Sequence, residues 1–191
     1  MSLTTAAKNT MLNALTVNLA SLHTAFPGLT GASEVTGGGY AQQAITFGAA
    51  AGSIRTSTGA VAFSVPISTI RWVGFWNGAT FIGYAPNGGT PQEFVAVPST
   101  DTIYCPAHGL SDTNKITFFN GTAPAGLTLG TVYFVRDSTT DTFKVAATAG
   151  GIAIDLTTAG TSDCQLSYIV EEAYAAPGTH TITVATLGLP F

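Results

Sequence analysis

The spacing of apolar residues predicts one helix at the start of the chain. Apolar residues recur at helical spacing from Met11 to Leu19, which favours a helix over residues 3–18. Thr4 or Thr5 can cap its first turn, since a threonine hydroxyl accepts a hydrogen bond from a free backbone N–H. We expect this helix either to pack on a sheet of the same chain or to dock onto a partner subunit.

From residue 19 onward the pattern changes to short apolar segments separated by clusters of Gly, Asn, Pro and Thr. Many short strands divided by turn residues are typical of an all-β sandwich or barrel. The expected strands are Ala44–Phe47, Val61–Val65, Ile70–Trp76, Thr80–Tyr84, Phe94–Val97, Thr102–Cys105, Lys115–Phe119, Val132–Val135, Thr142–Ala146, Ile152–Leu156, Gln165–Val170 and His180–Leu187.

Two turns join neighbouring strands into hairpins. Asn77-Gly78 stands between aromatic segments, and Asn-Gly tolerates the positive φ angles of a type I′ turn. Gly150-Gly151 predicts a second turn of this kind, between the strands at 142–146 and 152–156.

The expected strand Ile70–Trp76 is apolar on both faces. In a sheet with one solvated face, apolar and polar residues should alternate along each strand. Both faces must therefore be covered, one by the core and the other by the N-terminal helix or a partner subunit. For the subunit alternative, the interface residues are Ile70, Trp72, Val73, Phe75, Trp76 and Phe81.

Two similar sequence segments predict a domain boundary. Pro91–Ala96 and Glu171–Ala176 both run from an acidic residue through an aromatic one into small apolar residues. We expect a β-sandwich host domain, made of residues 1–97 and 169–191 with the helix, and an inserted small β-barrel-like domain over residues 98–168.

The two cysteines, Cys105 and Cys164, would lie on the first and last strands of the insert. They are expected to be either two neighbouring reduced thiols or, under oxidising conditions, a disulfide.

The amino-acid composition indicates which classes of partner the protein binds. Only 8% of the residues are charged and 46% are hydrophobic, against roughly 25% charged residues in an ordinary soluble domain. The surface is thus expected to be rich in small polar residues or buried against other subunits, and we predict a homo-oligomer, with a trimer as the first choice. The six Lys and Arg residues are dispersed and the net charge is −4, which argues against nucleic-acid binding. No apolar run approaches the ~20 residues of a spanning helix, so membrane insertion is not expected.

Catalytic chemistry is not indicated. His23, His108 and His180 lie in separate segments with no second ligand at metal-binding spacing. Glu171 and Glu172 are adjacent, so in a strand they point to opposite faces. We expect no enzyme activity, no cofactor and no metal, and we expect the His108 ring to bond the backbone of its own turn.

The order of several motifs resembles a family of siphophage tail fibre or minor tail proteins. These motifs are residues 21–28 (SLHTAFPG), 30–35 (TGASEV) and 37–44 (GGGYAQQA), followed by Gly74–Trp76 and Gly178–Leu187. The chain departs from the family at Phe26, often Asp, and at Gln42, often Arg. The insert resembles a second small β-module of phage structural proteins, through residues 101–103, 108–110, 124–127, 132–135, 141–146 and 150–151.

These resemblances imply a virion structural protein of a tailed bacteriophage, made in the host cytoplasm and bound to other virion proteins. A tail-tip or tail-fibre component acting in assembly or host attachment is the first expectation, and a capsid decoration or head protein is the alternative. An alternative from another class is a module that binds host-surface carbohydrate through exposed aromatics of the insert, such as Tyr104, Tyr133 or Phe134.

Overall fold

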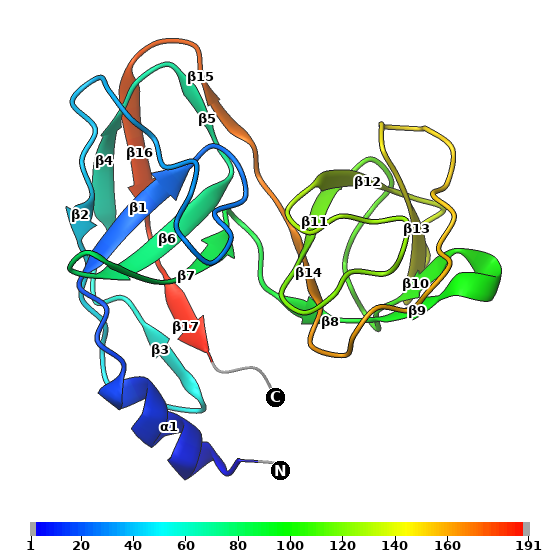
Figure 1. Cartoon of the computed structure of the whole chain (residues 1–191), viewed down its shortest axis with the longest axis horizontal. Helices are drawn as coiled ribbons and strands as arrows, with labels where there is room; N and C mark the ends of the chain where they lie inside the picture. Colours follow the sequence, from blue (N-terminus) through cyan, green and yellow to red (C-terminus); the bar gives the residue numbers. More distant parts are fainter. Residues whose placement is uncertain (1–2, 189–191) are drawn as a thin grey trace. The chain divides into compact units, whose positions relative to one another are not determined.

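The chain folds mainly as β-strands with one α-helix, so the all-β prediction is confirmed. The computed structural model describes residues 3–188, which form two compact units. The first unit holds the residues up to Ala85 together with those from Glu172 onward, and the second holds Pro86–Glu171. Figure 1 shows the chain entering and leaving the second unit once.

Helix α1 spans Thr5–Ala14 and is shorter than the sequence indicates. Thr4 caps it as predicted, because its hydroxyl oxygen accepts a hydrogen bond from the Ala7 N–H at 3.2 Å. Leu12 is buried, but Met11 on the predicted apolar face is half exposed. The helix packs beside strand β3 (Ile54–Thr56), whereas either the helix or a partner subunit was expected to cover the aromatic strand.

The largest sheet of the first unit has the strand order β2-β1-β6-β7. Strand β1 pairs with β6 along its whole length, from Leu19 opposite Trp76 to His23 opposite Trp72. Three further antiparallel pairs join β5 with β15, β4 with β16 and β3 with β17. The strands not yet bounded are β1 (Leu19–His23), β2 (Gln43–Ala44), β4 (Val61–Val65), β5 (Ser68–Ile70), β6 (Trp72–Asn77), β7 (Thr80–Pro86), β15 (Glu172–Tyr174), β16 (Gly178–Ile182) and β17 (Thr186–Gly188).

The core of this unit lies between the four-stranded sheet and the β4–β16 pair. Strand β4 alternates strictly, with Val61, Phe63 and Val65 buried and the residues between them exposed, as a strand covered on one face does. These side chains pack with Leu22 of β1 and Phe75 of β6 in one apolar cluster. Two sheets facing one apolar layer form a sandwich.

The hairpin predicted at Asn77-Gly78 is present, but its turn lies one residue further on. Asn77 ends β6, and the two turn residues are Gly78 and Ala79. Of the two, only Gly78 has positive φ, at 56°, whereas a type I′ turn needs two such residues. Glycine in the first central position is instead the preference of a type II′ turn.

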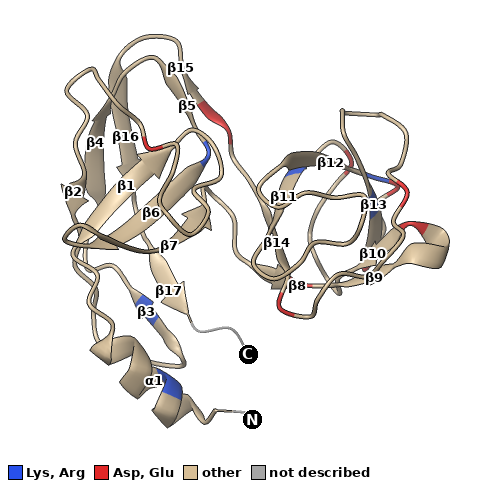
Figure 2. Ribbon diagram, in the orientation of Figure 1, with Lys and Arg blue, Asp and Glu red and all other residues tan. Residues whose placement is uncertain are grey.

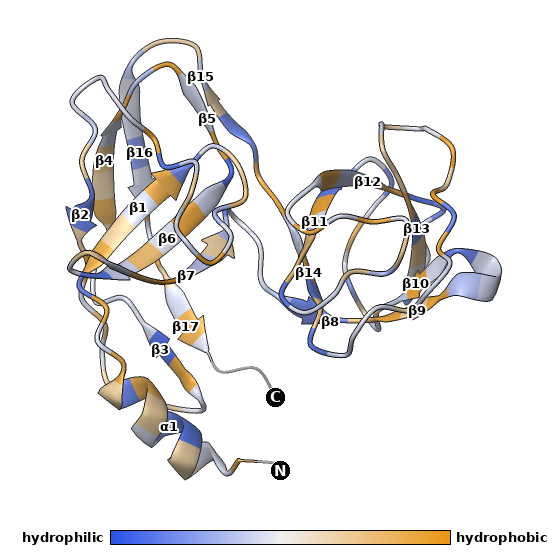
Figure 3. Ribbon diagram, viewed as in Figure 1, coloured by the Kyte–Doolittle hydropathy of each residue, from blue (hydrophilic) through white to orange (hydrophobic). Residues whose placement is uncertain are grey.

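The second unit is a single seven-stranded sheet with the order β8-β14-β11-β12-β13-β10-β9. Its edge strands β8 and β9 are separated in the chain only by Phe94, so the sheet curls until its two edges meet. No closed barrel of hydrogen-bonded strands results. In Figure 3 apolar residues stand out along β6 of the first unit and β11 of the second. The elements are β8 (Gln92–Glu93), β9 (Val95–Val97), the 3₁₀ turn η1 (Pro98–Thr100), β10 (Thr102–Tyr104), β11 (Lys115–Phe119), β12 (Val132–Arg136), β13 (Thr142–Ala146) and β14 (Gln165–Tyr168).

The boundary between the units differs from the one expected at residues 97/98 and 168/169. Strand β8 pairs with β14, and β9 pairs with β10, so residues 86–97 belong with the second unit. The segment 91–96 therefore lies in the second unit, and the similar segment 171–176 lies in the first unit except for Glu171. The similarity of the two segments reflects similar strand sequences and does not show that they belong to one domain.

Candidate functional site

The residues predicted as a subunit interface lie mostly inside the first unit. Ile70, Trp72, Val73 and Phe75 are at most 6% exposed, while Trp76 and Phe81 are half-buried. A contact with a second subunit through these residues stays a prediction, and only Trp76 and Phe81 keep surface for it.

The chain itself covers both faces of this aromatic segment. Ile70, Val73 and Phe75 enter the core cluster, because the strand breaks at Arg71 and the alternation of faces restarts there. The opposite face is covered by the segment around Phe26, whose ring meets the Trp72 ring edge-on at 5.0 Å between centroids. Strand β7 adds Phe81, whose ring lies 4.8 Å from that of Trp76.

Ser21, His23 and Trp76 form a chain of hydrogen bonds inside the four-stranded sheet. The His23 Nδ1–H donates to the carbonyl oxygen of Ala32 at 2.7 Å, which leaves Nε2 as an acceptor. The Ser21 hydroxyl donates to that Nε2 at 2.7 Å. The Trp76 indole N–H in turn donates to the Ser21 oxygen at 2.7 Å. The polar side-chain atoms of Ser21, His23 and Trp76 are thereby all hydrogen-bonded without solvent.

The serine–histidine geometry resembles that of a nucleophile and its base, yet burial gives it a different role. Ser21 and His23 are both 0% exposed, so a substrate has no path to the hydroxyl. Burial lowers the pKa of His23 from its usual value, with the carbonyl of Ala32 and the nearby Glu34 opposing the shift. The neutral ring thus holds β1, β6 and the segment at Ala32 together.

Gly74 makes room for this network. A Cβ added at Gly74 would come closer than 3.0 Å to His23 Nε2 and to the Ser21 oxygen. Gly74 is the first residue of the Gly74–Trp76 motif on which the family resemblance rests. The packing around it leaves no room for a side chain.

Tyr40 and Glu34 form a second polar cluster beside β1. The Tyr40 hydroxyl accepts from the Leu22 N–H at 2.8 Å and donates to Glu34 at 3.1 Å. Gln42 donates to the other carboxylate oxygen of Glu34 at 3.0 Å. Burial raises the pKa of Tyr40, and the charge of Glu34 adds to the shift. Gln42, which stands where the resembled family often has arginine, thus still donates a hydrogen bond to Glu34.

His180 meets a carboxylate near the start of β15. Its Nδ1 lies 3.2 Å from Glu172 and 3.2 Å from the Tyr174 hydroxyl, which also donates to Glu172 at 2.5 Å. Burial lowers the pKa of His180, and Glu172 opposes the shift. Burial and Glu172 raise the pKa of Tyr174 to about 12.

Cys105 and Cys164 are free thiols buried in the core of the second unit, so no disulfide joins them. Cys105 follows β10 and Cys164 precedes β14, and these strands do not pair with each other. The expected neighbouring terminal strands are absent because β8 and β9 occupy the positions beside them. Burial raises the pKa of both thiols, that of Cys164 to about 11, and a protonated thiol is a weak nucleophile.

The bond predicted for His108 is confirmed. Its Nδ1 accepts a hydrogen bond from the Leu110 N–H at 2.9 Å and so holds the turn at Gly109. Beside this turn lies an open depression of about 600 Å³, between the loops that connect β10 to β11 and β12 to β13. The lining residues are Ala107, Gly109, Leu110, Ser111, Asp112, Ser138, Thr139 and Thr140.

Charge and metal-binding groups are dispersed over both units. Figure 2 shows the few Lys and Arg residues scattered along the ribbon, and among the described Lys and Arg residues only Arg136 and Lys144 are cross-strand partners of each other, on β12 and β13. Among residues 3–188, no three His, Cys, Asp or Glu side chains gather as a metal site would require. No helix in the same range has the length and apolar character to cross a membrane.

Sequence reasoning did not foresee the Ser21–His23–Trp76 network or the loop depression. The spacing of Ser21 and His23 at i and i+2 on one strand face was the available signal for the network. Its partner Trp76 lies 55 residues away, and only strand pairing brings it close.

The comparison with known protein families gives a match to the first part of the chain. The model of the family described as podophage GP4 fiber I protein gp80 matches residues 2–110, more than half of the chain. The match covers the helix, the Ser21–His23–Trp76 network and the first strands of the second unit. Neither a curated protein nor a solved structure matches.

Proposed function

Since the chain belongs to the podophage GP4 fibre I protein gp80 family, we propose that it is a tail-fibre component of a podophage virion that acts in assembly or host attachment. The family is one of podophages, which corrects the siphophage expectation and keeps the phage-fibre part of it. The match over residues 2–110 is the observation that carries this proposal.

Several features of the chain support a structural role. The polar clusters at Ser21–His23 and at Tyr40–Glu34 are bonded within the fold and stabilise the first unit. Ser21 and His23 are fully buried and offer no reacting group to solvent. Few charges lie on the surface, which suits a protein that buries area against other virion proteins. The protein works as an oligomer, with three copies as the simplest arrangement for a fibre.

The location can be tested on the particle. A short epitope inserted at Ile152, a 90% exposed loop residue next to Gly150-Gly151, should leave both cores intact. Gold-labelled antibody on virions is expected at the tail fibres, and untagged virions serve as the control. Gold on the head would support the capsid alternative, and the absence of label from intact virions would contradict a virion role.

The protein is further proposed to have no hydrolytic activity. Purified chain incubated with envelope polysaccharide of the bacterium on which the phage grows should release no reducing ends. Cleavage that disappears on changing one carboxylate would contradict this.

A further inference from the structure

The loop depression of the second unit has walls fixed by side-chain bonds across the two loops. The Asp112 carboxylate accepts a hydrogen bond from the Ser138 N–H at 2.9 Å, and the Ser138 hydroxyl donates to the Leu110 carbonyl at 2.8 Å. At one side, the Ala107 N–H donates to the Asp141 carboxylate at 2.9 Å. Such pre-organised walls reduce the entropy lost when a ligand binds.

The same loops hold backbone in a costly conformation. Ala107, Thr113 and Asp137 have positive φ, at 51°, 73° and 51°. This region is unfavourable for a residue with a side chain, and for β-branched Thr113 it is an outlier. Strain of this kind persists only where the surrounding structure holds it in place, and the same conformation occurs outside these loops at Ser33, Ser53, Asp101 and Asn120.

The chemistry of the lining favours an uncharged ligand rich in hydroxyl groups. Ser111 and Thr140 contribute hydroxyls and Asp112 contributes a carboxylate, while no lining residue is cationic. The Thr139 hydroxyl is bonded to Thr142 within its own turn. The nearby Arg136 is engaged, because its guanidinium bonds the adjacent Asp137 at 3.1 Å and the Gly151 carbonyl at 2.5 Å. An anionic ligand would therefore meet a carboxylate without a cation to balance it.

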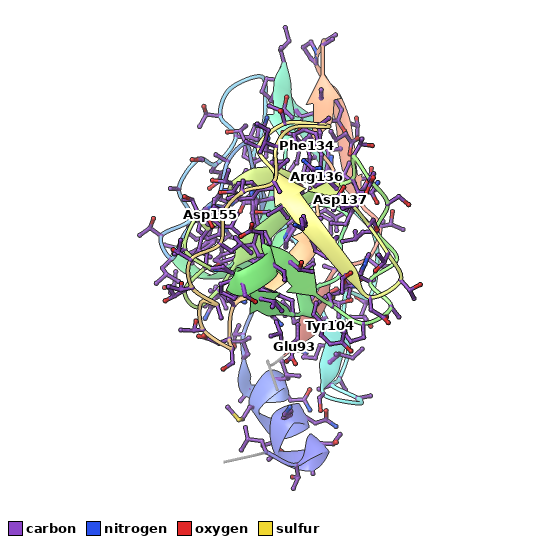
Figure 4. The ribbon with its side chains drawn as sticks, turned by 90° about the vertical axis from the view of Figure 1, so that its right-hand side faces the viewer. Glu93, Tyr104, Phe134, Arg136, Asp137 and Asp155 are labelled. Atoms are coloured by element: carbon purple, nitrogen blue, oxygen red, sulfur yellow. The ribbon has the colours of Figure 1, made fainter. Side chains whose placement is uncertain are left out.

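An exposed aromatic residue lies at the end of β10, just before the first loop that lines the depression. Tyr104 is 44% exposed and pairs across the sheet with Thr142, which follows the loop that lines the depression. On its other side it pairs with Val95, which is 59% exposed. Figure 4 shows Tyr104 on the side of the second unit that faces the viewer, where Arg136 and Asp137 are also labelled.

A ring of this kind and a hydroxyl-lined hollow together match the two surfaces of a sugar. The C–H face of a pyranose is apolar and packs on an aromatic ring, while its hydroxyls donate to a carboxylate and exchange bonds with serine and threonine. A volume of about 600 Å³ lies within the range of small-molecule sites. Tyr133, the other tyrosine considered from sequence, is buried and bonded to Thr128.

We propose that the depression formed by residues 107–112 and 138–140, with Tyr104 at its side, binds a neutral saccharide of the host-cell surface. This inference rests on the proposed fibre function and names the kind of receptor that the second unit takes. In it, Tyr104 packs on the sugar ring, Asp112 accepts from sugar hydroxyls, and Ser111 and Thr140 complete the polar wall.

The test is an NMR titration of the full chain, labelled with ¹⁵N, with neutral polysaccharide from the envelope of the bacterium on which the phage grows. Backbone amide shifts are expected in residues 104–114 and 137–142. Tyr104→Ala should weaken binding about tenfold, as the loss of one aromatic contact does, and Tyr104→Phe should bind as the wild type does. The matched control is Tyr168→Ala, which removes a ring of similar exposure (40%) from β14 of the same unit.

Asp112→Asn provides a second variant that separates recognition from folding. The amide keeps an oxygen for the Ser138 N–H, so the loops stay in place, but a neutral oxygen is a weaker acceptor for sugar hydroxyls. We expect weaker binding with an otherwise unchanged spectrum.

The outcomes separate the two proposals. No shifts with the envelope polysaccharide, shifts confined to other residues, or equal losses in Tyr104→Ala and Tyr168→Ala would each overturn the saccharide site. Gold label at the tail fibres together with any of these results would leave the fibre function standing. Label absent from the virion would remove the fibre function whatever the titration shows.

Discussion

His23 shows how a single buried side chain responds to pH. Its ring is neutral and bonded on both nitrogens, and burial lowers its pKa from the ordinary value of 6.5. In the unfolded chain the same ring takes up a proton below about pH 6.5. The unfolded state thus binds more protons there, so the free energy of unfolding falls as the pH falls through 6.5.

We predict that His23 does not titrate at its ordinary pKa in the folded protein. The ¹H–¹³C signal of its ring should stay at the neutral position from pH 7.5 down to below 6.5. The midpoint of urea unfolding should decrease over the same interval and below it. A ring that titrates in the folded state at or above pH 6.5 would refute the neutral assignment.

Gly74 gives a steric prediction at the same place. Gly74→Ala should lower the free energy of unfolding by about 1–3 kcal/mol, the usual cost of overpacking a core, because the new methyl group collides with His23 and Ser21. Urea unfolding measures this change. Gly83→Ala in β7 is the control, since a Cβ there has nothing within 4 Å, and an equal loss in both variants would argue against the steric cause.

Helix α1 depends on one arginine more than on its own sequence. Arg55 of β3 donates to the carbonyls of Leu12 and Leu15 at the end of the helix, at 2.8 and 2.9 Å. It also donates to the carbonyls of Gly48 and Phe47. A cation at a helix C-terminus satisfies carbonyls that have no partner within the helix and opposes the helix dipole.

Arg55→Lys should therefore loosen the helix. The single ammonium group cannot reach four carbonyls in the fixed geometry of a guanidinium, so we expect a loss of about 2 kcal/mol, of the order of one charged hydrogen bond. Amide exchange in residues 5–14 should accelerate in the same variant. Arg136→Lys is the control in the second unit, and it should leave exchange in α1 unchanged.

At the scale of the whole molecule, each unit has its own core and its own sheets. The chain crosses between them at Ala85–Pro86 and at Glu171–Glu172. On the second unit's side, Glu171 bonds Lys115, and on the first unit's side, Glu172 bonds Tyr174.

We predict that the first unit folds alone when residues 86–171 are replaced by a short Gly-Ser linker. Circular dichroism and dispersed amide signals that match the first-unit signals of the intact chain would confirm this. An unfolded product would contradict independent folding. The matched deletion of residues 98–168 should be less stable, because it leaves β8 and β9 without their partners β14 and β10.

Oligomerisation is a prediction at this scale as well. Charged residues are only 8% of the chain, and solubility ordinarily depends on dispersed surface charge. Light scattering on the purified chain is expected to give a mass of three copies. A copy in the assembled fibre with no neighbour burying about 800 Å² of its surface would contradict the prediction.

The sequence by itself determined the local features of this protein. Turn residues and β-branched segments marked most strands, because these preferences act within a few residues. Threonine at position 4 and the His108 turn could be read correctly for the same reason. The ordered motifs also pointed to a phage fibre protein, in agreement with the family that matches.

Only the tertiary structure decided which strands became neighbours, since pairing joins residues far apart in the chain. It placed β8 and β9 in the second unit, broke the aromatic strand at Arg71, and covered that strand with the segment around Phe26 and with β7, where a helix or a partner was expected. It also set Trp76 on Ser21 and joined two loops around a polar hollow. Sequence periodicity indicates on which face of a strand a residue lies, but it does not indicate which element covers that face.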